Sequence, residues 1–227
     1  MLIGGFQKFS LIDYPDKICA IVFTQGCNFR CGYCYNPELV EPKLFSPPIP
    51  EKEIFSFLEN RKEKLDAVEI TGGEPTLQPD LLEFIRKIKD MGFLVKLDSN
   101  GTHPDVIEKA IKDKLVDYIA MDIKAPLEKY AFVTQVNINV ENIKKSIDII
   151  MHSNLDYQFR TTVVKSLLSI DDLKQICKLI KGARCYILQK FRKRAKIVDS
   201  SLLNRAEYSE DEMQKFQDIV TALIQGE

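Results

Sequence analysis

Short apolar runs alternate with amphipathic runs along most of the chain. Most of the apolar runs are nearly continuous in hydrophobicity, which is typical of strands buried on both faces of a parallel sheet. The predicted strands are residues 19–23, 67–71, 93–98, 117–122, 157–163 and 185–189. Between them, apolar positions recur at helical spacing. The predicted helices are residues 51–61, 79–91, 105–112, 141–152, 171–181 and 210–224.

Two helix ends carry local signals. The helix predicted at 79–91 stops at Gly92, a residue type that suits a helix C-terminus. Ser209 is a predicted N-cap, so the C-terminal helical region covers about 207–225. No repeat, low-complexity tract or linker interrupts the pattern. We therefore predict a single domain over residues 1–227.

The alternation of strands and helices predicts an α/β fold. Six strands with interleaved helices imply parallel βαβ units with right-handed crossovers. Eight such units close a TIM barrel, and six predict a partial, open (β/α)6 TIM-like barrel. In such sheets the chemistry lies in the loops after the strand C-termini. Functional residues should therefore follow strands.

Composition and charge narrow the classes of partner. The chain has 227 residues, 45% of them hydrophobic and 29% charged, with a net charge of −1. This balance gives no drive toward nucleic acid or a membrane surface. The chain start lacks the layout of a signal peptide, and no apolar stretch reaches about 18 residues. We therefore expect a cytoplasmic protein that binds neither nucleic acid nor membrane.

Cysteines form the main candidate for chemistry. Thiols stay reduced in the cytoplasm, so six cysteines indicate metal binding or catalysis before disulfides. A loop over residues 24–37 follows the first predicted strand and carries Cys27, Cys31 and Cys34 at the spacing C-x3-C-x2-C. Thiolates suit iron–sulfur clusters and zinc. Three of them can hold three irons of a cubane and leave the fourth iron open to substrate.

Two alternatives to a cluster are a zinc site and three unrelated cysteines. Structural zinc takes four protein ligands, and both histidines lie far from the loop in sequence. Only 37 positions separate Cys34 from Gly72, which leaves no room for an inserted ferredoxin domain. Cys177 and Cys185 are expected to be buried as small hydrophobes rather than to hold a second cluster.

Polar segments follow the next three predicted strands, as the fold requires. They are Thr71-Gly72-Gly73-Glu74-Pro75, Asp98-Ser99-Asn100-Gly101 and Asp122-Ile123-Lys124. Each segment alone could be ordinary loop polarity, but all three belong to one predicted rim. Paired glycines allow a backbone to approach a ligand closely. Asp98 and Asp122 are candidates to bind a cation or a ribose, and Lys124 to pair with a carboxylate.

Three further polar residues lie on the last two predicted strands: Arg160, Thr162 and Gln189. They either fill the lumen of the barrel or contact the ligand. The run Lys190–Lys196 is basic; it is most simply a solvated surface, with docking of a partner as the alternative.

The cysteine spacing, with Tyr33 before the last cysteine, resembles that of the radical S-adenosylmethionine (SAM) superfamily. The resemblance implies a [4Fe–4S] cluster on Cys27, Cys31 and Cys34. It further implies that the open iron chelates the amino and carboxylate groups of SAM, and that one electron then yields a 5′-deoxyadenosyl radical.

The other segments extend the resemblance. Residues 72–75 resemble the GGEP segment that holds the ammonium of SAM, and D-S-N-G and D-x-K resemble segments of glycyl-radical-enzyme activating enzymes. There, the D-x-K segment contacts SAM, and the acids with Ser/Thr help to hold a monovalent cation. Beyond the cluster cysteines, the implied site residues are Tyr33, Tyr35, Gly72, Gly73, Glu74, Pro75, Asp98, Ser99, Asn100, Asp122, Lys124 and Gln189.

Residues 4–15 and 23–27 resemble the activating proteins of anaerobic ribonucleoside-triphosphate reductases. A common activator pattern is C-P-Y-C-H-N; here Gly32 replaces the proline and Tyr35 the histidine. The resemblance implies a glycyl-radical enzyme as protein substrate and an electron donor such as flavodoxin or ferredoxin. We expect the N-terminal run and residues 190–196 to lie near the open side of the barrel and to dock the partner.

Two other functions stay open from the sequence. One is a small-molecule radical SAM enzyme similar to 7-carboxy-7-deazaguanine synthase, which also has a short partial barrel. The other is a cluster-bearing electron carrier or sensor. The GGEP segment and the absence of a fourth cysteine near the loop disfavour the carrier.

Overall fold

The computed structural model describes residues 1–194 and 196–226. Its strands form one sheet in the order β1-β2-β3-β4-β5-β6-β7. The bounds are β1 (Ile3–Ser10), β2 (Cys19–Thr24), β3 (Ala67–Gly72), β4 (Leu94–Ser99), β5 (Tyr118–Asp122), β6 (Asp156–Val163) and β7 (Tyr186–Lys190). Strands β2 to β7 are parallel, and β1 runs antiparallel to β2 at one edge. The edge strands do not pair, which confirms the predicted open, partial barrel.

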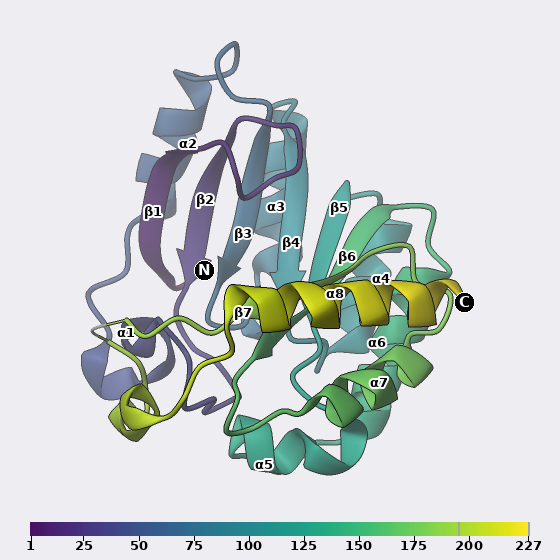
Figure 1. Cartoon of the computed structure of the whole chain (residues 1–227). Helices are drawn as coiled ribbons and strands as arrows, with labels where there is room; N and C mark the ends of the chain where they lie inside the picture. Colours follow the sequence, from purple (N-terminus) through teal and green to yellow (C-terminus); the bar gives the residue numbers. More distant parts are fainter. Residues whose placement is uncertain (195, 227) are drawn as a thin grey trace.

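Helices connect the parallel strands and cover the outer face of the sheet (Figure 1). Their bounds are α1 (Pro37–Val40), α2 (Glu51–Glu59), α3 (Leu81–Asp90), α4 (Pro104–Lys112), α5 (Tyr130–Thr134), α6 (Val140–Met151), α7 (Ile170–Leu179) and α8 (Glu210–Gln225). The six predicted helices are α2, α3, α4, α6, α7 and α8; the short α1 and α5 were not predicted. Helix α8 packs on α7 and β7. No helix in the described part of the chain has the length and apolarity to cross a membrane.

The core lies between the sheet and its outer helices. Residues such as Val68, Ile70 and Val95 of the strands are fully buried, and α3 places Ile85 and Ile88 against them. At the start of α8, the Ser209 hydroxyl accepts from the backbone of Glu212 in a capping box, as the predicted N-cap requires. Helix packing therefore fixes the strands whose ends carry the polar loops.

Strand β1 was not predicted. The sequence interpretation placed the run before the first strand, yet Ile3–Ser10 pairs with β2, with Ile3 opposite Thr24 and Ser10 opposite Cys19. The turn that follows, residues 11–18, therefore lies at the end of the sheet opposite the cysteine loop, at the top of Figure 1. The run lies at the open side of the barrel, as expected, because β1 is an edge strand of the unclosed sheet. Only the first residues of β1 reach the rim that carries the cysteine loop.

Candidate active site

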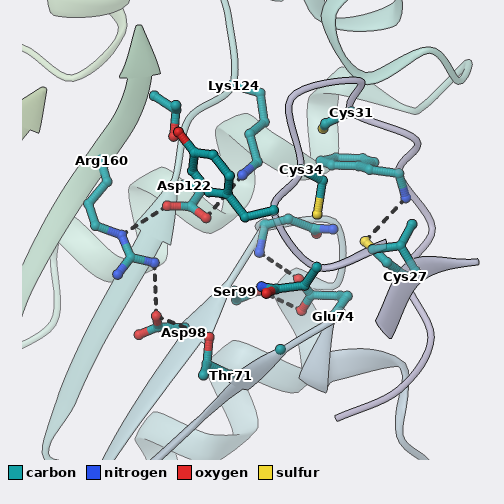
Figure 2. Close-up of a pocket in the computed structure, with 18 of the residues that line it drawn as sticks. Cys27, Cys31, Cys34, Thr71, Glu74, Asp98, Ser99, Asp122, Lys124 and Arg160 are labelled. Carbon is teal, nitrogen blue, oxygen red and sulfur yellow. Dashed lines mark hydrogen bonds and ion pairs between the residues drawn. The ribbon is translucent and has the colours of Figure 1, made fainter. Parts of the chain in front are cut away.

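The three cysteines of the loop after β2 face one cavity. It has a volume of about 260 Å³ and lies at the C-terminal ends of the parallel strands. Figure 2 shows Cys27, Cys31 and Cys34 together on one side of it, across from Arg160. All six cysteines are free thiols. The backbone N–H of Phe29 donates to the sulfur of Cys27 at 3.4 Å.

Every residue that the sequence assigned to the site lines this cavity, including the more distant Tyr33, Tyr35, Pro75 and Gln189. The same wall includes Arg160 and Thr162, and the Thr162 hydroxyl donates to Gln189 at 3.4 Å. Tyr33 is buried beside the cysteines. The parallel topology explains this gathering, because each segment follows the C-terminal end of a neighbouring strand.

The paired glycines after β3 fit against the cysteine loop. Gly73 donates its N–H to the carbonyl of Thr24 at 2.8 Å, and Glu74 donates to the carbonyl of Gly26 at 2.7 Å. A Cβ on Gly73 would lie 2.1 Å from the Gly26 oxygen. Gly72 has a φ of +111°, which L side chains rarely adopt. The glycines thus allow one chain segment to approach another and set the position of the residue before Cys27.

The Glu74 carboxylate joins two loops. It is buried and accepts from Thr76 N at 3.1 Å, from Ser99 Oγ at 2.9 Å and from Asn100 N at 2.6 Å. Burial raises the pKa of Glu74, although these donors favour its ionised form. The carboxylate therefore braces the loop after β3 against the loop after β4, at the wall of the cavity.

Asn28 adds a bridge that the sequence interpretation missed. Its side-chain oxygen accepts from Asn100 Nδ2 at 2.8 Å, and its amide donates to Thr102 Oγ1 at 2.9 Å. The cysteine loop is therefore tied to the loop after β4 as well as to the loop after β3. Nothing in the local sequence signals this contact, because it joins residues 72 to 74 positions apart.

Arg160 pairs with both acids of the rim (Figure 2). Its Nη2 lies 2.9 Å from Asp98, and its Nε lies 2.9 Å from Asp122. Lys124 Nζ is 3.0 Å from the other oxygen of Asp122. Burial alone would raise the pKa of Asp122, but Arg160 and Lys124 outweigh it and lower the pKa to about 2. The rim thus presents ionised acids held between fixed cations.

A second charged pair lies deeper in the barrel and was also missed. Lys96 Nζ is 2.6 Å from Glu69 and 2.9 Å from Asp98, and both Lys96 and Glu69 are almost fully buried. Burial, followed by the charge of Asp98, raises the pKa of Glu69 to about 9. The signal was present in the sequence: each of these two charges interrupts an apolar run that was itself predicted to be a buried strand.

A segment after β7 lies against the cysteine loop. We call residues 191–194 and 196–205 the C-terminal strap. Val198 N donates to the carbonyl of Cys34 at 3.1 Å, and Asp199 N donates to that of Gly32 at 2.8 Å. A Cβ on Gly32 would lie 3.0 Å from the Cβ of Asp199. The glycine that replaces the proline of the common activator pattern therefore lets the strap approach.

Tyr35, the second departure from that pattern, belongs to the same contact. Its ring stacks on Phe191 with centroids 5.9 Å apart, and its hydroxyl accepts from Arg192 N at 2.7 Å. Arg194 lies over the ring, 4.7 Å from its centroid. Tyr35 thus has one surface on the cavity and another on the strap.

The remaining cysteines lie outside the cavity lining. Cys177 is 2% exposed on α7, which confirms its predicted burial. Cys185 is only half-buried beside the start of β7, so its predicted burial is partial.

The residues present fit a cluster with three cysteine ligands. Within the described residues, no group of three or more His, Cys, Asp or Glu side chains is placed to hold a single metal ion. A mononuclear zinc site needs its sulfurs about 3.8 Å apart, from Zn–S bonds of about 2.3 Å in a tetrahedron. In a cubane cluster, Cys27, Cys31 and Cys34 would each hold one iron. Three free thiols around one cavity supply that donor set.

Comparisons with protein families and with known proteins match most of the chain. A family model described as the Radical SAM superfamily matches residues 21–180. A putative glycyl-radical enzyme activating enzyme of Methanocaldococcus jannaschii is 40% identical over 196 residues, which cover 84% of this chain and 80% of the relative. A 7-carboxy-7-deazaguanine synthase of Methanopyrus kandleri is 34% identical over 126 residues, or 47% of this chain and 49% of the relative.

Solved structures share the fold. Streptococcus suis SuiB bound to the precursor peptide SuiA superposes with a TM-score of 0.68 at 13% sequence identity. The match covers 90% of this chain and 45% of that one. At this identity the likeness concerns the fold alone.

Proposed function

Because this chain belongs to the radical SAM superfamily, whose enzymes use a [4Fe–4S] cluster and SAM, we propose that it activates a glycyl-radical enzyme. When bound, the cluster supplies the electron that cleaves SAM to methionine and a 5′-deoxyadenosyl radical. In the proposed reaction that radical takes a hydrogen atom from the Cα of one glycine of a partner protein. The products are 5′-deoxyadenosine and a glycyl radical on the partner.

One observation carries the choice of a glycine as target: the similarity to the archaeal relative named as an activating enzyme extends over most of both chains. The open barrel supports it, because a loop of a protein substrate must reach the cavity between the unpaired edges. The small-molecule enzyme of the comparisons matches only about half of this chain.

The chain's own residues have proposed roles at the cavity. Cys27, Cys31 and Cys34 hold the cluster. Lys124, kept cationic beside Asp122, pairs with an anionic group of SAM. Glu74 fixes the loop whose backbone faces the ammonium of SAM, because three donors already hold its carboxylate. These roles follow from placement around one cavity.

Other residues complete the proposed SAM site. Tyr35 lines the cavity wall, where its ring can contact the adenine. Asn100, in the loop after β4, and Gln189, on β7, supply amide groups to the cavity wall. A monovalent cation beside Asp98 and Asp122 is also a proposal. Since Arg160 already bridges these acids, SAM affinity measured in sodium, potassium and tetramethylammonium salts is its test.

The proposed partner is the anaerobic ribonucleoside-triphosphate reductase, and the proposed electron source is a flavodoxin or ferredoxin. Resemblance over residues 4–15 and 23–27 supports the reductase. The test is electron paramagnetic resonance on the reconstituted protein with SAM, dithionite and the candidate reductase. We expect a glycine-centred doublet on the reductase and formation of 5′-deoxyadenosine.

A second candidate function is the chemistry of a small purine-like molecule, favoured by the similarity to 7-carboxy-7-deazaguanine synthase. The two functions separate in one experiment. If every glycyl-radical protein of the source genome stays silent while a purine-like compound is consumed with SAM, the activating role is wrong. The small-molecule role then replaces it.

A further inference from the structure

We propose that the C-terminal strap is the docking surface for the electron donor, a small acidic one-electron carrier protein of the flavodoxin or ferredoxin kind. The inference deepens the proposed function, since it rests on a cluster held by the cysteine loop. One electron passes from the carrier to the cluster, so the carrier is oxidised by one electron and the cluster is reduced by one.

The position of the strap is the first support. Its backbone donates to Cys34 and to Gly32, so the strap lies directly against the loop that carries the cluster ligands. In Figure 1 the strap is the yellow-green segment beside α1. A protein seated on the strap is separated from the cluster by little more than this one layer of chain.

The charge of the strap is the second support. Four side chains of its first part are cationic and exposed to solvent: Arg192, Lys193, Arg194 and Lys196. Acids on neighbouring elements neutralise part of this charge. Glu210 pairs with Arg192 at 3.2 Å, and Glu207 lies 3.9 Å from Lys193.

Two of these cations remain available for a partner. Among the described residues, no carboxylate lies within ion-pair distance of Arg194 or Lys196. Glu38 and Glu41 line a groove together with Lys196, but Glu41 pairs with Arg30 at 3.3 Å. The exposed surface of the strap therefore offers unpaired positive charge to an acidic partner.

An aromatic contact links this surface to the active cavity. Arg194 lies over Tyr35, which stacks on Phe191. Tyr35 also lines the cavity that holds the cysteines. Tyr35 thus contacts the unpaired charge of the strap on one side and the cavity on the other. The two departures from the common activator pattern, Gly32 and Tyr35, are both in contact with the strap.

The strap suits an electron carrier better than the glycyl partner. A glycine must enter the cavity itself, whereas an electron needs only proximity to the cluster. A carrier must also leave after each electron, and redox encounters of this kind are small and transient. Unpaired surface charge speeds such encounters, because it steers association while adding little lasting affinity.

The test compares two triple variants of the cluster-loaded protein. The strap variant is Lys193→Gln with Arg194→Gln and Lys196→Gln. The matched control is Arg61→Gln with Lys62→Gln and Lys64→Gln. It removes three exposed cations just before β3, at the opposite end of the sheet.

Anaerobic stopped-flow absorbance follows reduction of the cluster by an acidic flavodoxin in its hydroquinone form, and by dithionite. A separate titration measures binding of oxidised flavodoxin to each variant. At low salt we expect the strap variant to be reduced by flavodoxin about tenfold or more slowly and to bind it more weakly, with the control near the parent protein. The difference should vanish near 0.5 M salt, where the Debye length falls to a few Å. Reduction by dithionite should be unchanged.

Four results would overturn the proposal. Equal flavodoxin rates in the strap variant and the parent would remove the docking role. Equal slowing in the control would attribute the effect to the net charge of the protein. Slower reduction by dithionite would attribute it to a damaged cluster. Glycyl-radical formation driven by dithionite must survive in the strap variant, because its loss there would assign the strap to the glycyl partner. A failure of the proposed function differs from all of these, since the parent protein itself would then form no glycyl radical.

Discussion

Substitution of Gly73 by alanine should displace the cysteine loop. In the structure a Cβ at this position lies 2.1 Å from the carbonyl oxygen of Gly26 and 2.7 Å from its carbonyl carbon. Both are backbone atoms, so no side chain can swing aside. The Gly26 carbonyl also accepts the N–H of Glu74 at 2.7 Å, so any retreat of Gly26 strains that hydrogen bond too.

The size of the effect follows from the overlap. The two segments must separate by about 0.9 Å to restore even a 3.0 Å contact. Overpacking of this kind costs about 1–3 kcal/mol of folding stability. The protein therefore folds, but the residue before Cys27 moves by a distance that a rigid three-point ligand set does not tolerate. We expect loss of the cluster from a folded chain.

Gly92 provides the matched control. Its φ is +93° and an added Cβ meets nothing within 4 Å, so Gly92→Ala costs about 1–2 kcal/mol through backbone strain alone. Both variants are thus destabilised to a similar degree, far apart in the fold. After anaerobic reconstitution, iron content, the absorption of the cluster and SAM affinity are measured, with urea unfolding to confirm folding. About four irons per chain and parental SAM affinity in Gly73→Ala would refute the reasoning.

Three further predictions concern buried and rim charges. Lys96→Met should cost about 1–3 kcal/mol in urea unfolding, because it leaves a buried oxygen of Glu69 without its hydrogen-bond donor, while Asp98 keeps its ion pair with Arg160; an unchanged free energy of unfolding would contradict this. Burial raises the pKa of Glu69 from 4.5 to about 9, so the folded chain holds a proton that the unfolded chain releases, and stability should fall as pH rises from about 4.5 toward 9. In Glu69→Gln the free energy of unfolding should fall less steeply with pH, and an unchanged pH dependence would rule out Glu69 as the titrating group. Lys124→Ala should weaken SAM binding about tenfold to over a hundredfold in calorimetry, through the loss of a charge-assisted hydrogen bond of about 1.5–3 kcal/mol, whereas Cys177→Ala should leave both affinity and iron content intact.

Regular elements were predictable because their signals are local. Strands β2 to β5 are mostly apolar runs bounded by polar residues, β6 and β7 alternate between buried and more exposed positions, and each long helix buries one face. Strand β1 was not predicted because only its two end residues are buried. Its middle residues are half-buried, and Gln7, Lys8 and Phe9 are exposed, so the run shows no apolar pattern. That exposure follows from the open barrel, which leaves the edge strand without a further neighbour.

The residues that line the site were predictable once the parallel strands were known. In a parallel sheet, all strand C-termini meet at one rim, so the cysteine loop, Gly72–Pro75 and the acids Asp98 and Asp122 had to gather there once the strands were known. Their grouping around one cavity follows from strand order alone.

The partners within the site depended on the tertiary structure. The resemblance to the superfamily offered the segment Gly72–Pro75 as the one that holds an ammonium, but the fold surrounds the Glu74 carboxylate with backbone and hydroxyl donors from the next loop. Arg160 was one of three weak candidates, and the fold places it between the two acids. Such contacts join residues 25 to 62 positions apart, and no spacing rule reaches that far.

By itself, the sequence determined the fold class, the spacing of the three candidate ligand cysteines and the rim on which they lie, because periodicity and spacing are properties of contiguous residues. Only the tertiary structure decided that Gly73 and Gly32 serve contacts between chain segments, and that Lys96 lies between two buried acids. The tertiary structure also decided that the basic strap lies against the cysteine loop. The physical reason is that close approach, burial and charge pairing depend on which distant segments meet in space, and that is settled by packing.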